Sequence, residues 1–240
     1  MRPLAWVLFL TVMALAPAAR AEPHGQVTFI KGTLERQVGD GRTAILVGGA
    51  IDAGDHLFTG QASSAELLFE DGSVVRLAPL TELEVKDLDV PPEGPSLKAQ
   101  LVLAAGAVWS SVVHLTGGGS YEVSSKWAVA GVRGTRFRVD ATPTNGAVEV
   151  YRGRVMVTGA EARASVPADP AMVLPGQRLA VDPSGFHPGP PLPVDEFGKW
   201  AAERPRPRLS EFTVHPLRES RALQHAERRQ ERRELRRERR

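Results

Sequence analysis

The feature that most constrains the fold is a series of short apolar segments, separated at close intervals by turn signals. From Gln26 to Val181, no long segment places its apolar residues at helical spacing. Turn-forming groups such as Gly48-Gly49, Pro91-Pro92 and Thr144-Asn145-Gly146 separate the segments. Between turns, apolar and polar residues tend to alternate, as in strands that bury one face. The pattern predicts an all-β body, built either as a single β-sandwich or as a rolled, solenoid-like sheet.

Three local predictions follow from the turn residues. Asp71-Gly72 lies between two short apolar runs and predicts a tight hairpin with a type I′ turn. Arg152-Gly153 predicts a second hairpin turn. The uncharged stretch from Ala99 to Tyr121, whose apolar part ends at Leu115, is expected to form two strands separated by a bend near Gly106.

The N-terminal residues 1–21 have the order of a secretory signal peptide. Arg2 is followed by an apolar run from Leu4 to Leu15 and by Ala19-Arg20-Ala21, with small residues where a signal peptidase cuts. The run is shorter than the roughly 20 residues that a membrane-spanning helix needs. We therefore expect a periplasmic or secreted protein with no membrane span in the mature chain. Cysteine is absent, so neither a disulfide nor a lipidated N-terminal cysteine is expected.

Charge divides the chain into an acidic body and a basic tail. From Glu22 to Gly198 there are 14 basic and 21 acidic residues, a net charge of −7, and from Lys199 to Arg240 there are 14 and 7, a net charge of +7. Residues 182–209 read as a Pro/Gly-rich linker. Residues 210–240 form an Arg/Glu-rich tail that is expected to be disordered or marginally helical, because like charges recur at four-residue spacing.

The tail has two interpretations of equal weight. It is either a solvated segment without a partner or a segment that contacts an anionic surface. In the second case, the contact residues would be Arg228, Arg229, Arg232, Arg233, Arg236 and Arg237. Nucleic acid is not an expected partner for an exported protein.

Several motifs in the body, from residue 25 to residue 181, resemble FecR-type domains. They include Gly54-Asp55, the run from Ser64 to Ser73 with its Asp71-Gly72, and Leu174-Pro175-Gly176-Gln177. The stretch "AVAGVRGTRFRV", which contains Gly131, fits a second family signature with Ala130, Val132, Arg133-Gly134-Thr135, Phe137 and Val139. The resemblance implies a periplasmic all-β domain with a binding function. The protein that gives the family its name relays iron-dicitrate uptake to a sigma factor, whereas this chain is expected to lack that protein's cytoplasmic anti-sigma segment and transmembrane helix.

Catalysis and cofactor binding are not expected. No two of the six histidines have the helical spacing of a metal site, and no G-x-S-x-G nucleophile motif is present. Asp55 and Asp71 adjoin glycines, so turn formation explains them better than acid–base chemistry. No catalytic, cofactor or metal residues are assigned.

Arg133 has two interpretations, a contact for an anionic partner and a buried clamp on backbone carbonyls at a bend between Gly131 and Gly134. The structural interpretation is preferred, since an arginine between glycines in a strand suits such a clamp. Arg136 and Arg138 are expected on the solvent face, and Trp109 and Trp127 in the core.

Two functions remain open. The first is a non-catalytic binding or sensing module that recognises an envelope protein or glycan through the β domain. The alternative is a structural or surface-associated scaffold, tethered to anionic envelope components by the Arg-rich tail.

Overall fold

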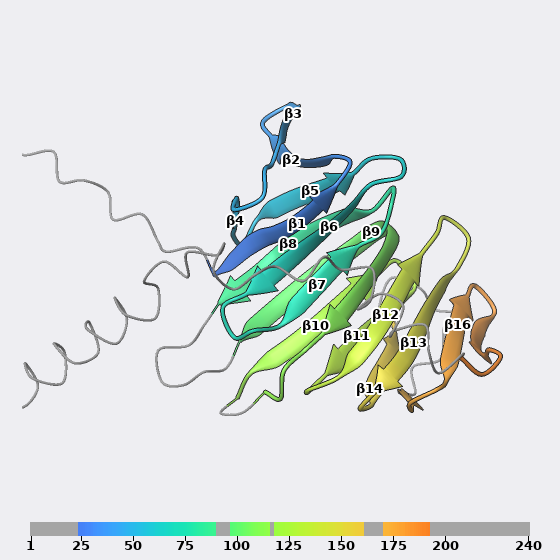
Figure 1. Cartoon of the computed structure of the whole chain (residues 1–240). Coiled ribbons are helices and arrows are strands. Elements are labelled where there is room, and N and C mark those ends of the chain that lie inside the picture. Colours follow the sequence, from blue (N-terminus) through green and yellow to red (C-terminus); the bar gives the residue numbers. More distant parts are fainter. Residues whose placement is uncertain (1–23, 90–96, 116–117, 161–169, 193–240) are drawn as a thin grey trace, which may run out of the picture. The chain divides into compact units, whose positions relative to one another are not determined.

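The computed structural model describes residues 24–89, 97–115, 118–160 and 170–192, and these residues form seventeen β-strands without an α-helix. Through β9 (Lys98–Ser111) the strands belong to one continuous hydrogen-bonded sheet, which is folded into two layers (Figure 1). This confirms the prediction of an all-β body. The sheet is not closed, because each layer ends in strands with one partner among the described residues.

Layer A contains nine strands, with β9 contributing its C-terminal half. In spatial order they are β4 (Ala50–Ile51), β1 (Gly25–Lys31), β6 (Ser64–Phe69), β7 (Val74–Leu77), β9, β12 (Arg136–Ala141), β13 (Gly146–Arg152), β16 (Arg178–Asp182) and β17 (Gly185–Pro188).

Layer B contains nine strands, with β9 contributing its N-terminal half. In spatial order they are β3 (Gly41–Ala44), β2 (Leu34–Val38), β5 (Asp55–Thr59), β8 (Glu82–Asp89), β9, β10 (Ser120–Ser125), β11 (Ala128–Val132), β14 (Val155–Gly159) and β15 (Ala171–Val173).

Strand β9 joins the layers. Its residues up to Ala105 pair in layer B, and those from Gly106 pair in layer A. Gly106 has φ of +90°, and a Cβ there would meet Thr81 Oγ1 at 2.4 Å, so a glycine is required at this change of layer. The bend predicted near Gly106 is confirmed, although it lies within one continuous strand. The following chain returns to layer B, which makes β9–β10 a parallel pair, while the other pairs in the described residues are antiparallel.

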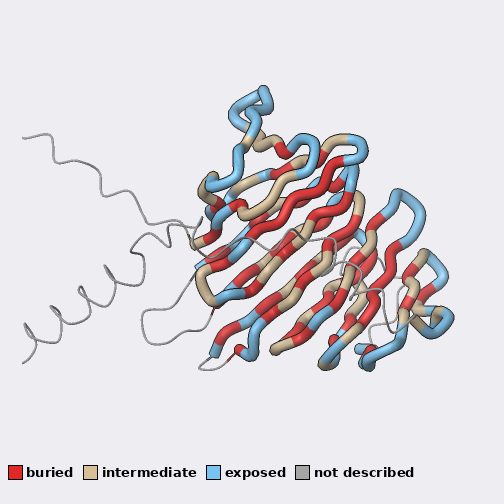
Figure 2. Tube along the Cα trace, viewed as in Figure 1, coloured by how far each residue is buried: buried red, intermediate tan, exposed pale blue. Residues whose placement is uncertain are grey.

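The hydrophobic core lies between the layers. Strands bury alternate residues, seen as red positions interrupted by tan and blue ones in Figure 2. Tyr121 of layer B packs edge-on against Phe137 of layer A, with ring centroids 6.2 Å apart. The Tyr121 hydroxyl also shares a 2.9 Å hydrogen bond with Ser110 Oγ of layer A. Trp127 is buried, as the sequence predicted, and donates from Nε1 to the Thr142 carbonyl.

Both predicted hairpins are present, but the turn type at Asp71-Gly72 is wrong. Gly72 has φ of +91°, whereas Asp71 does not have positive φ, so the loop between β6 and β7 is not a type I′ turn. The loop contains one left-handed glycine, with Gly72 N donating to the Phe69 carbonyl. At the other hairpin, Gly153 has φ of +82°.

The β body extends further than the sequence indicated. Strand β17 lies in the segment assigned to the linker and pairs with β16, with the Val181–Phe186 pair in its register. The backbone N–H of Leu192 also donates to the Gly176 carbonyl. Pairing with β16 supplies the hydrogen bonds that a proline- and glycine-rich segment was not expected to make.

Other predictions lie outside the described residues, namely the signal peptide over residues 1–21, the remainder of the linker and the tail with its arginines. In the part of the chain that the structure describes, no helix is long and apolar enough to cross a membrane.

Candidate binding site

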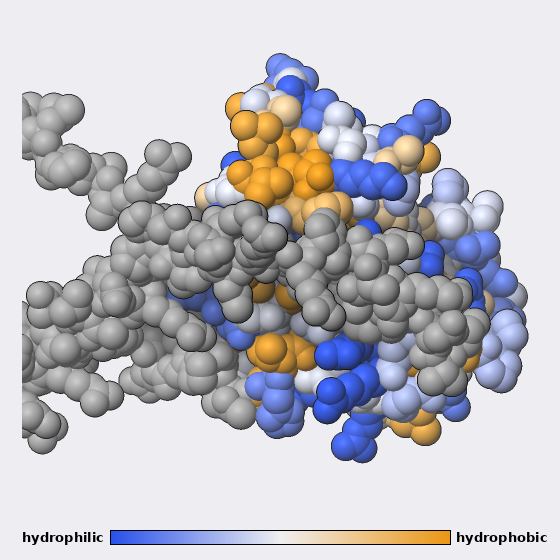
Figure 3. Space-filling model, viewed as in Figure 1, coloured by the Kyte–Doolittle hydropathy of each residue, from blue (hydrophilic) through white to orange (hydrophobic). Residues whose placement is uncertain are grey.

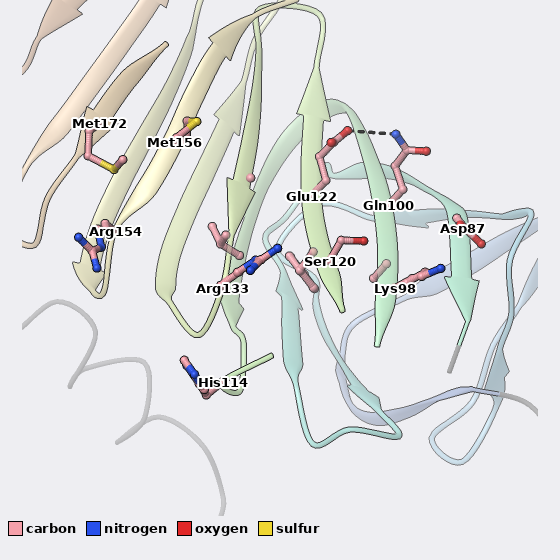
Figure 4. A pocket seen from close by; sticks show the side chains of 14 residues that line it. Asp87, Lys98, Gln100, His114, Ser120, Glu122, Arg133, Arg154, Met156 and Met172 are labelled. Carbon is pink, nitrogen blue, oxygen red and sulfur yellow. Dashed lines mark hydrogen bonds between the residues drawn. The ribbon is translucent and has the colours of Figure 1, made fainter. Parts of the chain in front are cut away.

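An open hollow of about 780 Å³ lies on the outer face of layer B. It is lined by residues of β8, β9, β10, β11, β14 and β15 and by three residues just outside strands, namely His114 after β9, Arg133 after β11 and Arg154 before β14 (Figure 4). Because inward-pointing residues fill the core, the hollow is formed mainly by the alternate, outward-pointing residues of the same strands.

The strand register arranges these residues in two rows across the layer. The first row follows the register pairs and consists of Asp87, Gln100, Glu122, Gly131, Met156 and Met172. The second row lies two residues from the first on each strand, on the same side of it, and contains the lining residues Lys98, Ser120, Arg133 and Arg154, with Asp89 of β8 opposite Lys98 at its end. The first row is therefore acidic and amide-bearing at one end and apolar at the other, whereas the lining residues of the second row are mainly basic.

Gly131 makes a gap in the first row. A Cβ at this position would meet no atom within 4 Å, so the space above its backbone is open. Its register partners are Glu122 on one side and Met156 on the other. Met156 and its neighbour Met172 are 48% and 49% exposed. The gap thus has a carboxylate on one side and flexible thioether side chains on the other.

The cations of the second row have no bonded counter-charge, although Asp89 of β8 is the register partner of Lys98. Within the described residues, the side chains of Lys98, Arg133 and Arg154 make no hydrogen bond or ion pair. The nearby carboxylate of Glu122 instead accepts a 3.0 Å hydrogen bond from Gln100 Nε2. His114 lies at the rim below Arg133 in Figure 4. The second row therefore presents a local positive charge on a body whose sequence is acidic overall.

Arg133 differs from the buried clamp that the sequence predicted. It follows the last residue of β11, where alternation directs it outward, and its side chain is exposed. The bend to β12 is held by Thr135, which is 1% exposed and donates from Oγ1 to the Arg154 carbonyl at 3.1 Å. The Thr135 carbonyl accepts from Val112 N, and Gly134 reverses the chain with φ of +76°.

The two aspartates predicted to form turns do so. Asp55 Oδ2 accepts hydrogen bonds from Asp52 N and Arg36 Nη2, each at 2.8 Å, around Gly54 with its φ of +91°. Asp71 accepts from the backbone N–H and hydroxyl of Ser73. Burial raises the pKa of Asp55 and of Asp71, and these hydrogen bonds oppose the rise.

The outer face of layer A holds the other two arginines of the motif. Arg136 and Arg138 point away from the core, as predicted. Arg138 pairs with Asp140 and lies 4.3 Å from the centroid of the Trp109 ring. Trp109 is therefore an outward-facing, half-buried residue, and its prediction as a core residue is wrong because β9 changes layer and faces at Gly106.

One cluster resembles a hydrolase site but lacks its geometry. In the hairpin between β16 and β17, His187 Nε2 lies 2.9 Å from Ser184 Oγ and 3.1 Å from Asp182 Oδ1. A nucleophile–base pair needs the carboxylate on the other ring nitrogen, where it orients the imidazole. Hydrogen bonds from Ser184 lower the pKa of Asp182 to about 2, and the turn is exposed. Among the described residues, no group of three potential metal ligands is present.

A second surface feature is a set of exposed apolar residues in and after the β2–β3 hairpin, Val38, Leu46 and Val47, which are 59%, 77% and 55% exposed. Hydrophobic residues gather at the end of the molecule that carries β2, β3 and β4 (Figure 3). The charged residues in this hairpin include Arg42, which stacks on the Phe58 ring at 3.5 Å, and these exposed residues define no particular ligand chemistry.

Sequence reasoning identified Gly131 and Arg133 but missed Lys98, Arg154, Met156 and Met172 as their neighbours. Alternation could have marked each residue as outward-pointing. Their proximity depends on which strands pair, and the pairing of β11 with β14 spans residues that are distant in the sequence.

Comparison with known proteins finds that residues 55–156 match the family described as FecR protein. Two crystal structures of a proposed anti-sigma factor from Parabacteroides distasonis ATCC 8503 are similar to this chain, each with a TM-score of 0.47 and 19% sequence identity. The similarity covers 61% of this chain and 63% and 64% of those chains, so the chain spans less than two thirds of their length. No curated protein matches it.

Proposed function

We propose that this chain, whose residues 55–156 match the FecR protein family, is an exported, non-catalytic module that binds an envelope protein or glycan. The family assignment supports a sensing or regulatory module. The export is a proposal based on the N-terminal 21 residues.

The observation that carries the proposal is the hollow on the outer face of layer B. It combines an open gap at Gly131 with three cationic side chains that have no partner among the described residues. A concave surface with a few convergent polar groups is the usual form of a binding site. The Ser184–His187 cluster lacks the geometry of a nucleophile and base, so binding without catalysis is the better account.

Site-specific photocrosslinking in the producing cells tests this function. A photoreactive residue replaces Met172 in the hollow or, as a control, Val38 at the far end, both of which are exposed. We expect a discrete adduct from position 172 and none from position 38. Equal labelling from both positions, or recovery of the protein from the cytoplasm, would contradict the proposal.

The alternative is a scaffold that the Arg-rich tail tethers to anionic envelope components. The net charge of +7 from Lys199 to Arg240 favours it. Deleting residues 217–240 separates the two functions. If envelope retention disappears while no adduct forms at position 172, the body is a carrier; if the adduct persists, the body is the binding module.

A further inference from the structure

We propose that the hollow binds an extended peptide segment in which an acidic residue lies two positions from an aliphatic residue. The inference rests on the proposed function, and it selects a protein segment over a glycan as the ligand. It also states where each of the two side chains is held.

The acidic side chain of the peptide would bind at the basic residues of the second row. Arg133 follows and Arg154 precedes the register pair formed by Val132 and Val155, so the two arginines lie at the adjoining ends of neighbouring strands, and their side chains make no hydrogen bond or ion pair among the described residues. A bound anion would offset the repulsion between these like charges. A guanidinium group pairs with a carboxylate through two parallel hydrogen bonds, and Lys98 adds a third positive charge in the same row.

The aliphatic side chain of the peptide would bind in the gap above Gly131. Above this residue, a side chain of the ligand meets open space next to Met156, with Met172 beyond it. Thioether side chains are flexible and polarizable, and they adapt to aliphatic groups of different shape. The gap therefore accepts a leucine-, isoleucine- or valine-sized group without selecting one strictly.

The distance between the gap at Gly131 and the arginines sets how far apart in the peptide sequence the two side chains must be. Arg133 lies two residues beyond Gly131, a distance of about 6.6 Å along an extended chain. In an extended peptide, side chains two positions apart point to the same side with the same spacing. A peptide that follows the direction of β11 thus places one side chain over Gly131 and the other at the level of Arg133 and Arg154.

Other ligand classes fit the hollow less well. Tyr121, which lines it, is 1% exposed and packs against Phe137, so apart from the His114 imidazole at the rim the lining offers no ring for base stacking. Sugar hydroxyl groups do not match unpaired cations next to two thioethers. Recognition of acidic motifs by arginine clusters is, in contrast, a recurrent form of peptide binding.

Subtractive selection from a library of random displayed decapeptides tests the proposal. The library is first depleted on the full chain carrying Arg133→Glu and Arg154→Glu and then selected on the unaltered full chain, which removes peptides that bind the tail. We expect enrichment of sequences with Asp or Glu two positions from Leu, Ile or Val. No enrichment, or enrichment of basic peptides, would overturn the proposal.

Binding of the most enriched peptide to single variants tests the positions. Gly131→Val places a side chain in the gap, where its Cβ meets nothing within 4 Å, and should weaken binding at least tenfold. The matched control is Gly41→Val, in the distant strand β3, where the nearest atom would lie 3.9 Å from a Cβ. Arg154→Glu should also weaken binding tenfold, whereas Arg152→Glu, on β13 of layer A, should not.

The outcomes separate this inference from the proposed function. If the cellular adduct at position 172 forms equally in the Arg133→Glu, Arg154→Glu double variant, the chain is a binding module but the ligand position is wrong. If vesicles of anionic phospholipid bind through Arg133 and Arg154 while no peptide is enriched, the peptide assignment is wrong.

Discussion

At the scale of single residues, the bend between β11 and β12 depends on Thr135 rather than on the arginine beside it. We expect Thr135→Val to lower the free energy of unfolding by about 1–2 kcal/mol, because the buried Thr135 side chain loses its hydrogen bond to the Arg154 carbonyl while its volume is kept. Arg133→Ala should change it by less than about 0.5 kcal/mol, since the side chain is exposed and unbonded within the described residues. Urea unfolding measures both. The reverse ranking would restore Arg133 as the clamp.

A second residue-scale prediction concerns Tyr121, whose pKa burial raises well above the usual value. Above pH of about 10, the unfolded chain loses this proton and the folded chain keeps it, so stability falls as pH rises. Tyr121→Phe should remove this part of the pH dependence and cost about 1 kcal/mol at neutral pH, because Ser110 loses its partner. Unfolding curves at several alkaline pH values, for both proteins, provide the comparison. Parallel pH profiles would show that Tyr121 ionises in the folded state.

At the scale of elements, β9 is the strand on which both layers depend. Gly106→Ala combines positive φ with a Cβ that would lie 2.6 Å from Thr81 Cα and 2.8 Å from the Leu80 carbonyl oxygen. We expect a loss of about 3 kcal/mol or more, since backbone atoms cannot move aside as a flexible side chain does. Gly131→Ala is the matched control, because that glycine has no positive φ and no neighbour within 4 Å. Thermal unfolding followed by circular dichroism distinguishes the variants; similar midpoints would mean that the layers tolerate a shifted β9.

The elements also show what could be predicted from the sequence. Alternation and turn residues gave the strands, the hairpins and the bend at Gly106, since these depend on neighbouring residues. The turn type at Asp71-Gly72 was wrong because loop length and strand register decide it jointly. The change of face at Trp109 and the grouping of Arg133 with Arg154 depend on which strands pair, and local patterns carry no such information.

At the scale of the whole molecule, the buried apolar residues found in the described part of the chain lie between Val27 and Val181. A chain of residues 22–192 should therefore fold alone, with a thermal midpoint within about 2 °C of the chain 22–240, because a change well below 1 kcal/mol shifts the midpoint little. Calorimetry of the two proteins tests this. A midpoint lowered by ten degrees would show that residues 193–240 contribute to the fold.

The order of the strands has a consequence for how the protein is made. In most of each layer, successive strands along the chain are added next to strands already formed, up to β15 and β17. A chain that emerges N-terminus first, from a ribosome or an export channel, thus offers each new hairpin an existing edge to join. Folding can advance with synthesis or translocation, and no early strand has to wait unpaired for the last one to arrive.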